Sequence, residues 1–140
     1  MFRNGMRVLI IDDQPQVRSA LRLLLREELG VTAAGEAGDL AQALELIGVE
    51  QPDLVLLDWE LPARGGAAEV LANLRTAYPG LAVIALSARP GARQAALAAG
   101  ADGFVSKGEP PERVVDGVKR AAIEEVMAGR LDRQAVQPAR

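Results

Sequence analysis

Val8-Leu9-Ile10-Ile11-Asp12-Asp13, together with the similar run Leu54-Val55-Leu56-Leu57-Asp58, decides the fold of this 140-residue chain. Each stretch is a short apolar run that ends in one or two aspartates. Continuous apolar runs of this length are typical of strands buried on both faces, as in a parallel sheet. Charged residues that follow such runs lie at the rim of the sheet, so three carboxylates meet if the two strands are neighbours. Such a cluster predicts a hard-oxygen site for a divalent cation, with one carboxylate free to act as a nucleophile.

The composition excludes several classes of protein. A length of 140 residues with 49% hydrophobic content predicts one compact domain with its own core. The absence of Cys and His excludes a disulfide framework, an imidazole base and His-ligated zinc or haem. A net charge of −3 without a basic run argues against nucleic-acid binding by this domain. Without a long apolar run or a visible signal peptide, we expect a cytoplasmic protein with no membrane partner.

Strand-like runs alternate with amphipathic helical stretches along the chain. This alternation predicts βαβ units, and right-handed crossovers with helices on both faces give a single α/β domain with a doubly wound five-stranded parallel sheet. We expect the domain at residues 7–128, between an N-terminal extension at 1–6 and a tail or linker stub at 129–140. The runs begin near Val8, Val31, Leu54, Leu81 and Gly103.

Local signals place three of the helices. Asp39, with Gln42 three residues later, predicts a capped helix start. Pro110-Pro111 predicts the start of the last helix, because the N–H that proline lacks has no partner in a first turn. The Ala-rich stretch 93–99 offers few large apolar anchors, so we expect it to be the least firmly packed helix.

Four of the expected strand ends carry polar side chains: Asp12-Asp13, Asp58, Ser87 and Lys107 follow the first, third, fourth and fifth strands. With their neighbours, these residues resemble the response-regulator receiver domain of bacterial two-component signalling over roughly residues 7–128. The motifs that carry the resemblance are Ile11-Asp12-Asp13, Leu57-Asp58-Trp59-Glu60-Leu61-Pro62 with Gly65-Gly66, Leu86-Ser87-Ala88, and Gly103-Phe104-Val105-Ser106-Lys107.

The resemblance implies a flavodoxin-like strand order 2-1-3-4-5, with the acids at its switch point. It implies Mg²⁺, with Mn²⁺ as a substitute, bound directly by Asp13, Asp58 and the main-chain carbonyl of Glu60, and through water by Asp12. A sensor histidine kinase or phosphotransfer protein would supply the phosphoryl group, and a homodimer could follow phosphorylation. The domain would not be an enzyme beyond catalysing its own phosphorylation and dephosphorylation.

The resemblance also assigns roles to single residues. Asp58 would be the phosphoacceptor, while Lys107 and Ser87 would contact the phosphoryl oxygens. Ser87 would then move, and Phe104 would turn inward and change the face formed by the fourth helix, fifth strand and fifth helix. The family often has Thr where Ser87 stands and Tyr where Phe104 stands. We further hypothesise that Glu60 and Arg89 pair and set the lifetime of the phosphoryl group; the alternative is two unrelated surface charges.

Simpler interpretations stay open for each residue alone. Asp13 could be a helix N-cap, Asp58 a turn residue, Ser87 a loop hydroxyl, Lys107 a solvated charge and Phe104 a core residue. Other functions also stay open: a receiver that binds proteins without phosphorylation, a phosphatase of the haloacid-dehalogenase type, or a module that binds a flavin mononucleotide. The stretch 117–131 is similar to receivers that precede a helix-turn-helix of the nitrate-regulator type, so both a stand-alone receiver and part of a longer regulator are possible.

Overall fold

The computed structural model describes residues 6–107 and 110–129. Five parallel strands form one sheet in the order β2-β1-β3-β4-β5, so the predicted fold class and strand order are confirmed. The strands are β1 (Arg7–Ile11), β2 (Thr32–Ala37), β3 (Leu54–Asp58), β4 (Ala82–Ser87) and β5 (Gly103–Ser106). The helices between and after them are α1 (Pro15–Leu29), α2 (Leu40–Glu50), α3 (Gly66–Ala77), α4 (Ala92–Ala98) and α5 (Pro111–Met127).

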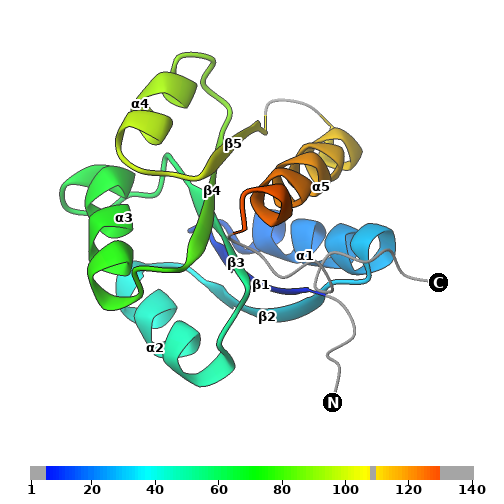
Figure 1. The fold of residues 1–140 in the computed structure, drawn as a ribbon, viewed down its shortest axis with the longest axis horizontal. Helices are drawn as coiled ribbons and strands as arrows, with labels where there is room; N and C mark the ends of the chain where they lie inside the picture. Colours follow the sequence, from blue (N-terminus) through cyan, green and yellow to red (C-terminus); the bar gives the residue numbers. More distant parts are fainter. Residues whose placement is uncertain (1–5, 108–109, 130–140) are drawn as a thin grey trace.

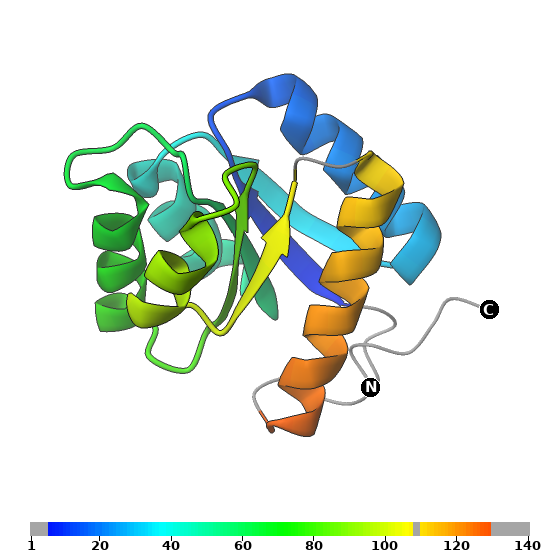
Figure 2. The ribbon, with the colours of Figure 1, turned by 90° about the horizontal axis from the view of Figure 1, so that it is seen from above.

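Helices cover both faces of the sheet, so that it lies between two helical layers (Figures 1 and 2). Helices α1 and α5 cover one face, and α2, α3 and α4 cover the other. Alternate residues of each strand enter opposite cores: Ile10 and Leu56 face α1 and α5, whereas Ile11 and Leu57 face the other layer. Because both faces are buried, these strands are continuous apolar runs without a polar alternation.

The segments expected to flank the domain, 1–6 and 129–140, lie outside the described residues except for Met6 and Gly129. Met6 is buried in the core beneath α1 and α5. Within the described part of the chain, we find no helix whose length and hydropathy would suit a membrane span.

The ends of the helices follow local chemistry. The side chain of Asp39 caps α2 by accepting a hydrogen bond from the Gln42 amide at 2.9 Å, as predicted. The N-cap of α1 is Gln14, with Pro15 in the first turn, so the interpretation of Asp13 as the N-cap is wrong. Asp13 is therefore an exposed carboxylate without a capping role.

The two C-terminal helices differ in how they contact the sheet. Helix α4 has seven residues and buries only two alanines, Ala92 and Ala96. Helix α5 buries three valines and lies so close to β5 that a Cβ atom built on Gly117 would be 2.7 Å from Cγ1 of Val105. Real Cβ atoms do not approach a neighbour this closely, so only glycine fits here without a shift of the helix.

We predict that Gly117→Ala destabilises the protein, although alanine is the better helix former by about 1 kcal/mol. Overpacking against Val105 costs about 1–3 kcal/mol, so a net loss of about 1 kcal/mol is expected in urea denaturation. Asp116→Ala, at an exposed position of the same helix, is the control and is expected to be neutral or stabilising. A gain in stability for Gly117→Ala would contradict the close contact.

Candidate functional site

Four strands deliver polar side chains to one edge of the sheet. Asp12 directly follows β1, Asp58 and Ser87 are the last residues of β3 and β4, and Lys107 directly follows β5. The strands are parallel, so their carboxyl ends meet at the same edge. The structure therefore brings together the residues that the sequence places at strand ends.

Asp12, Asp13 and Asp58 form an acidic cluster in which one carboxylate oxygen from each lies within 4.8 Å of the others. Asp12 and Asp58 are buried, with exposed fractions of 1% and 3%, whereas Asp13 is exposed. The amide of Gln14 donates to Asp12 Oδ1 at 2.9 Å, and the amide of Glu60 donates to Asp58 Oδ1 at 3.0 Å. The cluster has the hard oxygen donors that Mg²⁺ prefers.

Lys107 supplies the cation of the cluster. Its Nζ lies 2.9 Å from Asp58 Oδ1 and 3.2 Å from Asp12 Oδ2. Burial raises the pKa of Asp58, and the nearby Asp12 adds to this, although hydrogen bonds from Lys107 and from the Glu60 amide oppose the rise. Burial by itself lowers the pKa of Lys107, but the hydrogen bond and charge of Asp58, with those of Asp12, outweigh it and raise that pKa.

The raised pKa of Lys107 reflects the negative charge of Asp58 and Asp12 around its ammonium, whereas the raised pKa of Asp58 comes first from burial. When ionised, the three carboxylates carry −3 and the Lys107 ammonium carries +1, which leaves −2. A divalent cation would balance this charge, so the residues fit the metal that the sequence predicts.

Ser87 is fully buried and donates its hydroxyl hydrogen to the carboxylate of Glu60, with 2.6 Å between Ser87 Oγ and Glu60 Oε2. The amide of Ala88 donates to the other oxygen of Glu60 at 3.1 Å. Arg89 Nε lies 3.7 Å from Glu60 Oε2, so the two side chains predicted to pair are neighbours. Arg89 also donates its amide hydrogen to Ser87 Oγ at 3.0 Å.

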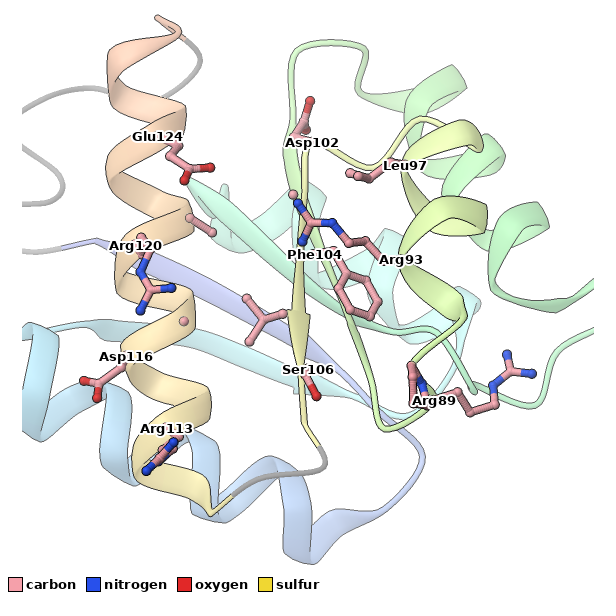
Figure 3. Close-up of a pocket in the computed structure, with 15 residues that line it drawn as sticks. Arg89, Arg93, Leu97, Asp102, Phe104, Ser106, Arg113, Asp116, Arg120 and Glu124 are labelled. Carbon is pink, nitrogen blue, oxygen red and sulfur yellow. The ribbon is translucent and has the colours of Figure 1, made fainter.

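Phe104 lies on β5 opposite Ala85, two residues before the position paired with Ser87 in the ladder. Its ring is partly buried against the core beneath α2, α3 and α4. Figure 3 shows the ring beside α4. Phe104 lines an open groove between α4 and α5 that has a volume of about 1030 Å³. Arg113, Asp116, Arg120 and Glu124 line the α5 side of this groove.

Several contacts near the site are not predicted by the sequence motifs. Arg18 of α1 donates to the main-chain carbonyl of Asp12 at 2.5 Å and pairs with Glu36 of β2 at 3.2 Å, which fixes the loop that carries Asp12. Arg22, four residues later on the same side of α1, pairs with the same Glu36. This spacing could have predicted the ion pairs of α1 with β2 once the strand order was known. The contact of Glu60 with Ala88 depends on loop geometry and has no sequence signal.

A protein-family model described as the response regulator receiver domain matches residues 8–119. Receiver domains generally bind Mg²⁺ at an acidic pocket, interact with histidine kinases or phosphotransfer proteins, and are generally not enzymes. The match covers all eight residues predicted for the site, and it removes the alternatives of a phosphatase and a flavin-binding module.

Individual proteins agree with the family model. The chain is 37% identical to the transcriptional activator protein ExaE of Pseudomonas putida over 140 residues, covering 95% of this chain and 64% of that protein. It is 33% identical to the nitrate/nitrite response regulator protein NarL of Escherichia coli K12, covering 86% of this chain and 56% of that protein. The chain thus spans less than two thirds of the length of each relative.

A two-component response regulator of the LuxR family from Aurantimonas has a solved structure that is 31% identical, with a TM-score of 0.74 and coverage of 91% of this chain and 89% of that one. With its strand order and its acidic edge, the chain belongs to the response regulator receiver domain family.

Proposed function

We propose that this domain is a phosphorylation switch in which Asp58 accepts a phosphoryl group from a phosphohistidine on a sensor kinase or phosphotransfer protein. The observation that carries the proposal is the clustering of Asp12, Asp13 and Asp58, of which Asp12 and Asp58 contact the Lys107 ammonium, with an uncompensated charge of −2 when all are ionised. A receiver that binds proteins without phosphorylation would not need this costly cluster.

The reaction joins a carboxylate oxygen of Asp58 to phosphorus while the phosphorus–nitrogen bond of the donor breaks, and the imidazole keeps the electron pair. Phosphoryl transfer requires mainly alignment and charge neutralisation from the protein. Lys107, 2.9 Å from Asp58, would neutralise charge on the phosphoryl oxygens. The hydroxyl of Ser87 and nearby backbone amides would hold the remaining oxygens.

Asp13, Asp58 and the main-chain carbonyl of Glu60 would hold Mg²⁺ or Mn²⁺ directly, and Asp12 would contribute through a water molecule. When bound, the ion would supply charge neutralisation and alignment of the phosphoryl oxygens. The grouping of the three carboxylates within 4.8 Å, with Asp13 exposed to solvent, supports this assignment.

The signal would be read at the face formed by α4, β5 and α5. Ser87 would move toward the phosphoryl group, and Phe104 would turn from the groove into the space that Ser87 leaves. Because the relatives ExaE and NarL carry the names of transcription regulators and are longer, we propose that this domain controls a DNA-binding helix-turn-helix in a longer regulator. A homodimer that forms on phosphorylation would fit such an output.

Incubation with acetyl phosphate and Mg²⁺ is expected to add one phosphoryl group, detected by intact-protein mass spectrometry. The gain should be lost in Asp58→Asn and on removal of the cation with EDTA, and retained in the surface control Asp116→Asn. Phosphorylation of Asp58→Asn to the same extent would place the acceptor elsewhere. No gain with any donor would favour a receiver that acts without phosphorylation.

Asp13→Asn is expected to stabilise the metal-free protein and to abolish the added stability that Mg²⁺ gives. Removing one of three neighbouring like charges at an exposed position relieves about 1 kcal/mol of repulsion. The unfolding temperature is measured without Mg²⁺ and at Mg²⁺ concentrations that increase in tenfold steps, which gives both effects. Asp116→Asn is the control. An unchanged response to Mg²⁺ would show that Asp13 is not a ligand.

The lifetime of the phosphoryl group is expected to depend on Glu60 and Arg89 together, because their side chains are 3.7 Å apart. Dephosphorylation rates of Glu60→Ala, Arg89→Ala and the double variant form a double-mutant cycle. We expect the change in rate of the double variant to differ from the product of the two single changes. A change equal to that product would identify two independent surface charges.

A further inference from the structure

The end of β4 and the residues after it present two hydrogen-bond donors and one cation to a single anion. The Ser87 hydroxyl and the Ala88 amide each donate to one oxygen of the Glu60 carboxylate, at 2.6 and 3.1 Å. The Arg89 guanidinium lies 3.7 Å from the same group. A hydroxyl, a backbone amide and a cation are also the groups that bind phosphoryl oxygens in proteins. Glu60 therefore occupies a cradle that suits a second, larger anion.

The Ser87 hydroxyl can donate to only one acceptor at a time, because it has a single hydrogen. Its oxygen already accepts a hydrogen bond from the Arg89 amide at 3.0 Å, and its hydrogen is directed to Glu60. The side chain is fully buried, so water does not compete for this hydrogen. A phosphoryl group on Asp58 can receive the hydroxyl hydrogen only if Glu60 gives it up.

We propose that Glu60 is an internal competitor of the phosphoryl group, holding Ser87 and Ala88 until phosphorylation expels its carboxylate. This inference rests on the proposed function, since it concerns the same acceptor Asp58. Two anions, one of them carrying about −1.5 to −2 charges, would repel each other across this cradle. Glu60 thereby opposes the phosphorylated state and keeps the switch off when no phosphoryl group is bound.

The test is the affinity for trifluoroberyllate, a mimic of the phosphoryl group, measured by calorimetry in the presence of Mg²⁺. Glu60→Ala is expected to bind it roughly tenfold more tightly, because a hydrogen bond to a charged group no longer has to be broken. Glu60→Gln should be intermediate, since its amide oxygen still accepts from Ser87 without a negative charge. Glu50→Ala, which removes a partly exposed carboxylate paired with Arg7 at the other edge of the sheet, should match the wild type.

A Ser87→Ala background separates the contact from simple charge repulsion. There the gain from Glu60→Ala should shrink, because Glu60 and the phosphoryl mimic no longer share a hydroxyl. In the unphosphorylated protein, the amide proton resonance of Ala88 should shift in Glu60→Ala and stay in place in Glu50→Ala.

Equal or weaker binding by Glu60→Ala would overturn the inference and leave the proposed function intact. An undiminished gain in the Ser87→Ala background would also overturn it, because Glu60 would then act only through its charge. If neither the wild type nor Glu60→Ala bound the mimic, or if Asp58→Asn bound it equally well, the proposed function would fail and this inference with it.

Discussion

The parallel pairing of β1 with β3, in which Ile11 lies opposite Leu57, is the constraint on which the site depends. It puts the residues that follow, Asp12 and Asp58, side by side at one edge. A slip of one residue would turn every side chain of the strand to the opposite face, so the two buried cores hold the register firmly. The apolar side chains that stabilise the sheet thus also set the geometry of the acids.

This arrangement is unfavourable for the acids themselves. Asp12 and Asp58 are almost fully buried beside Asp13, and Lys107 balances only one of the three negative charges. Burial raises the pKa of Asp58, and the charges of Asp58 and Asp12 raise the pKa of Lys107. Packing on both faces of the sheet offsets the cost, as is common where function requires strained groups.

The fold and most of the site follow from patterns that the sequence displays directly. Buried strands are short apolar runs, and their last residues share an edge, so the positions of Asp12, Asp58, Ser87 and Lys107 were predictable. The strand order came from the resemblance to receiver domains rather than from periodicity.

Other features depend on loop backbone and rotamers, which leave no periodic signal. The N-cap of α1 is Gln14 rather than Asp13, because the helix begins at Pro15. The sequence predicts Glu60 beside Arg89, but it does not show that the Glu60 carboxylate also binds Ser87 and the Ala88 amide. Those contacts require the two loops after β3 and β4 to be placed in space.

The absence of a side chain at Gly117 gives the two helices beside β5 different contacts with the sheet. Helix α5 lies directly against Val105, so a movement of β5 at this point would be passed on to α5. Helix α4 buries only Ala92 and Ala96, and it begins five residues after Ser87. Under the proposed switch, a displacement of Ser87 would be taken up by α4 sliding relative to α5, and a partner protein would sense a change in the width of the groove between them.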